Sequence, residues 1–206
     1  MNAIVEYYEL IKSGKEITSY KVERTYQHIV EDIIQNKQSQ WEYDHDKALH
    51  AIDFIEVFTK HSKGSMGGQP FILELWQKAL VSAMFGIVDK IDGGRKYQEV
   101  ILIVGRKNGK STLAAAIGLY LMIADGELGP EIFSVATKKD QAKIIWLEAK
   151  KMVQKSPALR KRIKTLVAEM NSGLNDSVFK PLGRDSDTLD GLNVHGALFD
   201  KLCPKQ

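Results

Sequence analysis

The segment that most limits how this chain can fold joins an apolar run to a helical run through a glycine–lysine–serine triplet. The apolar run, 99–104, contains consecutive β-branched and leucine side chains, which are typical of a strand buried in a parallel sheet. The helical run, 110–123, is rich in alanine and leucine. A strand joined to a helix by a short glycine-containing turn predicts an α/β fold.

The residues of that turn suit it to hold phosphate. Positions 105–112 read Gly-Arg-Lys-Asn-Gly-Lys-Ser-Thr. Backbone N–H groups and the N-terminus of the following helix favour anionic oxygens there. In loops of this kind the lysine reaches the terminal phosphates and the serine hydroxyl ligates Mg²⁺. The pattern is a variant, because Val104 stands where a first glycine is usual. We expect ATP and Mg²⁺ to be bound by Gly105, Asn108, Gly109, Lys110, Ser111 and Thr112.

A phosphate-binding loop of this type also needs an aspartate at the end of a buried strand, where it holds the metal ion's water shell. The run 194–199 is a strand candidate, and Asp200 follows it directly. We expect Asp200 and Ser111 to bind the metal. Many strands end in aspartate, so the alternative of an ordinary strand terminus stays open on this pattern alone.

The rest of the chain divides near a pair of glycines, Gly93 and Gly94. Before them, apolar residues recur at helical spacing, which predicts a helical region over 1–93. After them, strand and helix patterns alternate, which predicts a phosphate-loop (P-loop) NTPase core with an open sheet over 94–206. The expected strands beyond the first are 132–136, 178–181 and 194–199, and the expected second helix is 140–153.

Composition narrows the choice of partners. The single cysteine excludes an intrachain disulfide, and no leader pattern is present. Apolar runs fall short of the roughly 18 residues that a membrane span needs, so we expect an intracellular protein without a membrane partner. The segment 138–164 holds ten lysines and arginines against two acidic residues. It is either a surface that faces nucleic-acid phosphates or a solvated helix face.

In this order, four segments resemble the terminase large subunit of tailed bacteriophages. They are 70–77, the phosphate loop, 136–142 and 189–200, so the resemblance runs along most of the chain. It implies an ATPase that drives double-stranded DNA into a procapsid in the host cytoplasm. The small terminase subunit and the portal ring would be its partners, with several copies assembled on the portal.

The resemblance also implies roles for individual side chains. Arg106 would stabilise charge on the γ-phosphate, acting with Lys110 as a catalytic residue. Gln77 would read adenine, with Trp76 beside it. The residues themselves leave structural alternatives open: Trp76 lies on an apolar helix stripe that predicts a core position, and Gln77 and Arg106 have the polarity of solvated side chains.

Two features depart from the family pattern. The family has a glutamate directly after the strand-ending aspartate, whereas this chain has Lys201. A lysine ammonium at its ordinary pKa cannot act as a base at neutral pH, so we expect little ATP turnover. The chain also ends at Gln206, before the family's coupling motif, further strands and nuclease domain. The alternatives are a non-hydrolysing nucleotide-binding remnant and a DNA-binding module that uses 138–164.

Overall fold

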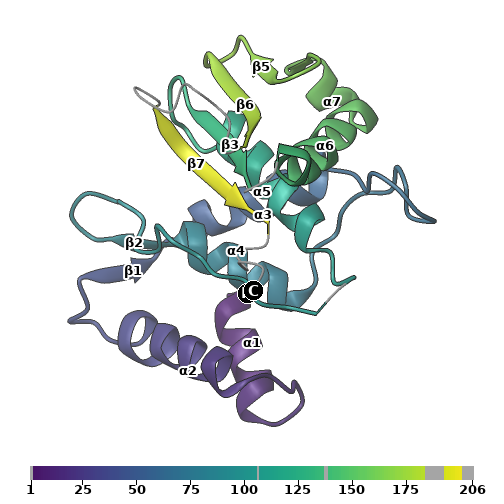
Figure 1. The fold of residues 1–206 in the computed structure, drawn as a ribbon. Helices are drawn as coiled ribbons and strands as arrows, with labels where there is room; N and C mark the ends of the chain where they lie inside the picture. Colours follow the sequence, from purple (N-terminus) through teal and green to yellow (C-terminus); the bar gives the residue numbers. More distant parts are fainter. Residues whose placement is uncertain (1, 106, 137–138, 184–192, 201–206) are drawn as a thin grey trace. The chain divides into compact units, whose positions relative to one another are not determined.

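The computed structural model describes residues 2–105, 107–136, 139–183 and 193–200, which belong to two compact units (Figure 1). The first unit is Met1–Asp53 with Ile72–Leu102, and the second is Phe54–Phe71 with Ile103–Gln206. The expected division at 93–94 therefore differs from the observed one. The segment 54–71 lies in the expected helical region but packs with the second unit.

The first unit is mainly helical. Its helices are α1 (Ala3–Lys12), α2 (Tyr20–His28) and α4 (Leu75–Gly86), together with the first part of α3 (His45–Phe58). The Asn2 side chain caps α1 by accepting a hydrogen bond from the Ile4 backbone N–H at 3.0 Å. The helical spacing of apolar residues at the start of the chain is confirmed, because these residues of α1 are buried: Ile4, Tyr7, Tyr8 and Ile11.

Two parts of the first unit were not predicted. The helical pattern that begins in α2 continues as a π-helical turn, η1 (Ile29–Ile34), which still buries Ile29, Val30 and Ile33. Strands β1 (Trp41–Tyr43) and β2 (Ile87–Asp89) pair antiparallel. Each has three residues, which is too short for alternation to be recognised in the sequence.

The second unit contains a five-stranded mixed sheet of order β4-β5-β6-β3-β7. Strands β3 (Glu131–Val135), β6 (Ser177–Leu182) and β7 (Val194–Phe199) are parallel, and they lie side by side in Figure 1. These are the three later strands that the sequence predicts. The short strands β4 (Lys164–Thr165) and β5 (Met170–Ser172) extend the sheet antiparallel and were not predicted. The predicted α/β class is confirmed.

Helix α5 (Lys110–Ile123) packs directly on the sheet through two glycines. A Cβ atom on Gly118 would lie 2.7 Å from Leu198 Cδ1, and one on Gly196 would lie 2.8 Å from Leu121 Cδ1. Position 121 of the helix is therefore opposite position 196 of β7, and position 118 is opposite position 198. Because the two numberings run in opposite directions, α5 is antiparallel to β7.

Helix α6 (Lys139–Lys155) lies beside α5 and over β6. Its Trp146 Nε1 donates a hydrogen bond to the Phe179 carbonyl at 3.1 Å, which joins the helix to the sheet. The four-residue helix α7 (Pro157–Arg160) follows, with Ser156 as its N-cap. Within the described ranges, no helix combines the length and apolar character needed to cross a bilayer.

The predicted strand over 99–104 does not form, and this corrects the sequence analysis. Residues 98–105 have no regular secondary structure. Ile101 and Ile103 are 78% and 88% exposed, where the prediction placed both in a buried sheet. A strand is stabilised by backbone hydrogen bonds to a neighbour, and among the described residues no strand pairs with this segment. Its apolar composition alone was therefore insufficient.

Candidate nucleotide-binding site

The predicted phosphate loop has a backbone that can enclose an anion. Lys107 and Gly109 both have left-handed conformations, with φ of 68° and 70°. A left-handed residue in such a turn directs successive N–H groups towards one side, which makes a concave anion site. For the non-glycine Lys107 this conformation costs on the order of 1 kcal/mol. The loop therefore keeps a strained conformation at the position where the sequence predicts phosphate.

The N-terminus of α5 continues this anion site. Gly109 is the N-cap of the helix and, having no side chain, provides no hydrogen-bond acceptor for the first-turn N–H groups. These groups and the helix dipole together favour a negatively charged ligand. Ser111 and Thr112 lie in this first turn and are partly exposed.

The Lys110 ammonium lies over the loop. Its Nζ donates to the Val104 carbonyl at 2.9 Å and to the Gly105 carbonyl at 3.3 Å. Both acceptors belong to the same turn, so the positive charge stands beside the N–H groups that would hold phosphate. The side chain of Asn108 also lies close to Gly105, where a Cβ atom would be 3.1 Å from Asn108 Nδ2.

Asp200 lies towards the same end of the sheet as the first turn of α5. It follows β7 directly and is partly exposed. Because α5 is antiparallel to β7, the C-terminal end of β7, which precedes Asp200, lies towards the N-terminal end of α5, which contains Ser111. The fold thus places an acidic residue and a hydroxyl towards one end of the unit, and a magnesium site formed by them stays a prediction. Arg106 and Lys201 are outside the described residues.

The two predicted adenine-side residues lie in the first unit, at the start of α4. Gln77 is 4% exposed, so it is buried rather than solvated. Its Oε1 accepts a hydrogen bond from the Glu74 backbone N–H at 2.9 Å, which caps the helix. Trp76 packs against the hydrophobic core of the helical unit. Both side chains therefore have structural roles here, and their contact with adenine stays a prediction.

One buried charged side chain in the second unit was missed by the sequence analysis. Glu148 on α6 is 6% exposed and accepts a hydrogen bond from Thr112 of the phosphate loop. In the sequence it was counted only among the charges of the basic segment. A signal was available, because Glu148 shares its helix face with the buried residues Ile145 and Met152. A carboxylate within an apolar stripe indicates a buried interaction.

The basic segment is only partly free for contact with a partner. Lys150 Nζ donates to the Leu166 carbonyl and lies 4.9 Å from the centre of the Trp146 ring, so it stabilises the unit's own packing. Lys143 forms an ion pair with Asp140 at 3.7 Å. Most of the other basic side chains are exposed, and these are Lys151, Lys155, Arg160, Lys161, Arg162 and Lys164.

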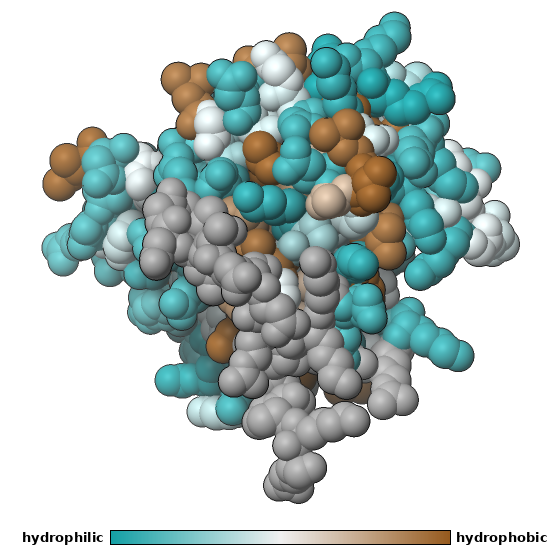
Figure 2. All heavy atoms as spheres, turned by 45° about the horizontal axis from the view of Figure 1, so that its top comes forward, coloured by the Kyte–Doolittle hydropathy of each residue, from teal (hydrophilic) through white to brown (hydrophobic). Residues whose placement is uncertain are grey.

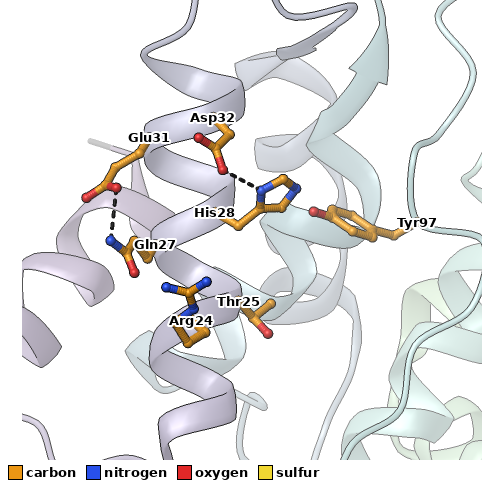
Figure 3. A pocket seen from close by; sticks show the side chains of 7 residues that line it. All are labelled: Arg24, Thr25, Gln27, His28, Glu31, Asp32 and Tyr97. Carbon is orange, nitrogen blue, oxygen red and sulfur yellow. Dashed lines mark hydrogen bonds and ion pairs between the residues drawn. The ribbon is translucent and has the colours of Figure 1, made fainter.

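A surface pocket in the first unit is formed by side chains from α2, η1 and Tyr97 (Figure 3). Its polar groups are paired along the same helical segment: His28 Nδ1 lies 2.7 Å from Asp32 Oδ2, and Gln27 Nε2 donates to Glu31 Oε2 at 3.0 Å. Burial raises the pKa of the Tyr97 hydroxyl above its ordinary value. Throughout the described part of the chain, no group of three metal-binding side chains occurs.

The distribution of hydrophobic side chains on the surface does not indicate where a binding site lies. On the face drawn in Figure 2, the coloured hydrophobic side chains form small groups among hydrophilic ones, as on an ordinary protein surface. The backbone of the phosphate loop, rather than an apolar patch, therefore marks the candidate site.

Comparison with known proteins is consistent with this geometry. The model of the family described as "Terminase large subunit, ATPase domain" matches residues 75–204. The terminase large subunit of Enterobacteria phage HK97 is 32% identical over 153 residues, covering 73% of this chain and 29% of that protein. The crystal structure of the HK97 bacteriophage large terminase aligns with a TM-score of 0.63 at 28% identity, covering 75% of this chain and 31% of that one. The chain thus spans under a third of the length of these relatives.

Proposed function

This chain belongs to the terminase large subunit family, and from this premise we propose that it is the ATP-binding portion of a motor that packages double-stranded DNA into a viral procapsid. The observation that carries the proposal is the loop before α5, with its left-handed Lys107 and Gly109 and the ammonium of Lys110 beside them. A phosphate chain fits such a loop because N–H groups, a helix N-terminus and a lysine converge there.

The residues also fit a magnesium–nucleotide complex. Backbone N–H groups of the loop and Lys110 would hold the phosphates, while the Ser111 hydroxyl and the Asp200 carboxylate would hold the metal. Oxygen ligands of this kind are what Mg²⁺ prefers. Bound ATP would supply the phosphoanhydride bond whose cleavage drives movement of DNA. Arg106 and Lys110 would balance the negative charge that shifts between phosphate oxygens during transfer.

Family membership supports the wider role. The partners are double-stranded DNA, the small terminase subunit and the portal of the procapsid, with several copies of the chain around the portal. The host cytoplasm is the place of action. Exposed basic side chains on α6 and α7, such as Lys151 and Arg160, support a contact with DNA phosphates.

The experiment that tests nucleotide binding compares the chain with its Lys110→Ala variant. Titration calorimetry with ATP and Mg²⁺ should show a loss of affinity of at least tenfold, about 1.4 kcal/mol, because the variant lacks the ammonium that meets the phosphates. Lys90→Ala is a suitable control, since Lys90 is exposed and belongs to the helical unit. Equal affinity of the chain and Lys110→Ala for ATP would remove the phosphate-loop assignment.

A second candidate function is nucleotide binding without hydrolysis. One structural observation favours it: residues 99–104, which precede the phosphate loop, form no strand and expose Ile101 and Ile103. A loop that is not anchored by a strand holds its catalytic groups less firmly. Lys201, which stands at the position of the family's glutamate, also favours binding without hydrolysis. Measured ATP turnover separates this candidate from an active motor.

A further inference from the structure

Glu148 is a buried acidic side chain that joins two distant segments of the second unit. The Ser62 hydroxyl donates to Glu148 Oε1 at 2.6 Å, and the Thr112 hydroxyl donates to the same oxygen at 3.3 Å. Lys63 Nζ lies 3.8 Å from Oε2. A buried carboxylate is strongly unfavourable unless such donors surround it, so this arrangement requires all three segments to stay in place.

The first of these segments is the phosphate-loop helix. Thr112 lies in the first turn of α5, directly after Lys110 and Ser111. Its hydroxyl is directed to Glu148 on α6, so of the two neighbouring hydroxyls Thr112 is engaged inside the unit. The Ser111 hydroxyl is then the one available to a metal ion.

The second segment is a glycine-containing surface loop, residues 61–70, which we call the 61–70 loop. Its ends are held together by backbone hydrogen bonds, from His61 N to Gln69 O and from Gly68 N to His61 O, each of 2.9 Å. Residues 63–67 are exposed. Ser62 is buried at the base of the loop, so a displacement of Glu148 would be transmitted to the loop as a whole.

We propose that Glu148 is a positioning residue that fixes the Thr112 side chain and couples occupancy of the nucleotide site to the 61–70 loop. The inference rests on the proposed binding of a nucleotide at the phosphate loop. Phosphate binding draws the first turn of α5 towards the ligand and so changes the long Thr112–Glu148 hydrogen bond. The short Ser62–Glu148 bond carries this change to the loop. Because such coupling is reciprocal, removing the loop's contact also changes nucleotide affinity.

The test uses the complete chain and MgADP as the probe. Two quantities are measured: the affinity for MgADP by calorimetry, and hydrogen exchange of amides 61–70 with and without MgADP. The variants are Glu148→Leu, which has a similar size but no oxygen to accept either hydrogen bond, and Ser62→Ala, which leaves the Glu148–Thr112 contact intact. Ser65→Ala is the matched control, because Ser65 is an exposed serine of the same loop. Thermal unfolding of each variant reports its stability separately.

In the unchanged chain, MgADP should alter exchange within the 61–70 loop. Glu148→Leu and Ser62→Ala should each abolish that response and weaken MgADP binding about fivefold to tenfold, which is at the low end for coupled sites. The double variant should bind no more weakly than Glu148→Leu, because both changes interrupt one connection. Ser65→Ala should behave as the unchanged chain does.

Two results would overturn this inference while leaving the proposed nucleotide binding intact. In the first, MgADP binding depends on Lys110 but Ser62→Ala and Glu148→Leu lower only the unfolding temperature, leaving affinity and the exchange response intact. In the second, the effects of the two changes on affinity are additive. If the unchanged chain binds no MgADP, the proposed function fails as well, and the binding measurement shows this before any variant is compared.

Discussion

Replacing Gly118 by alanine tests how closely α5 packs on the sheet. The added methyl group should destabilise this packing more than alanine's higher helix propensity stabilises α5. The new Cβ atom would lie 2.7 Å from Leu198 Cδ1 and 2.9 Å from Phe179 Cε1. Favourable carbon–carbon contacts are about 3.5–4.0 Å, so both groups, or the helix itself, must move by about 1 Å. Phe179 is fully buried, which leaves little room for its ring to yield.

Two opposing effects set the magnitude. Adding a methyl group to a tightly packed interface costs about 1–3 kcal/mol. Alanine is favoured over glycine in a helix by about 1 kcal/mol, which offsets part of this cost. We expect the free energy of unfolding to fall by about 1 kcal/mol, the middle of the resulting range. The displacement would also move the first turn of α5 relative to Asp200, so affinity for MgATP should fall.

Urea unfolding followed by tryptophan fluorescence measures the stability change, and calorimetry measures affinity. Gly173→Ala is the control, because no atom lies within 4 Å of a Cβ atom at Gly173 and its φ is not in the left-handed range. Its stability should equal that of the unchanged chain or slightly exceed it. If Gly118→Ala unfolds at the same or a higher urea concentration than the unchanged chain, the inferred close packing of α5 on β7 is wrong.

Two further predictions concern DNA and turnover. Exchanging Lys151 and Lys155 for glutamate should weaken sequence-independent DNA binding and reduce its salt dependence in a filter-binding assay. Lys150 is left unchanged because it packs against Trp146. Equal affinity of the variant and the unchanged chain for DNA at low salt would show that the basic segment is only a solvated face. The chain should also bind ATP with little or no phosphate release in a steady-state assay, because Lys201 stands where the family has a glutamate. Robust ATP hydrolysis that Lys110→Ala abolishes would contradict this prediction.

The glycine turn and the start of α5 could be predicted because their signal is local, while phosphate binding at this turn stays a prediction. Glycine at 109, lysine at 110 and a following alanine-rich helix lie within one short stretch of sequence, and the structure has a left-handed residue and a helix start at those positions. The left-handed Lys107 could not be predicted in this way, because a non-glycine residue adopts that conformation only when its surroundings require it. The placement of Arg106 and Lys201 lies outside the described residues, so their roles stay predictions.

Periodicity determined most of the helices and the three parallel strands, since the spacing of apolar residues depends on short-range geometry. It failed for 99–104, where an apolar run has no partner strand among the described residues, and for β1, β2, β4 and β5, which are too short to show a pattern. A strand's backbone hydrogen bonds come from another part of the chain, so composition cannot guarantee them.

The sequence by itself pointed to the family, which the comparisons confirm, and it predicts a phosphate ligand for the loop at 105–112. Only the tertiary structure decided that Gln77 is buried in a helix cap and that Glu148 links Thr112 to Ser62. Ser62 and Glu148 are separated by 86 positions, so no local pattern relates them. Their contact exists because α5, α6 and the 61–70 loop pack together, and burial then makes a single carboxylate depend on donors from each.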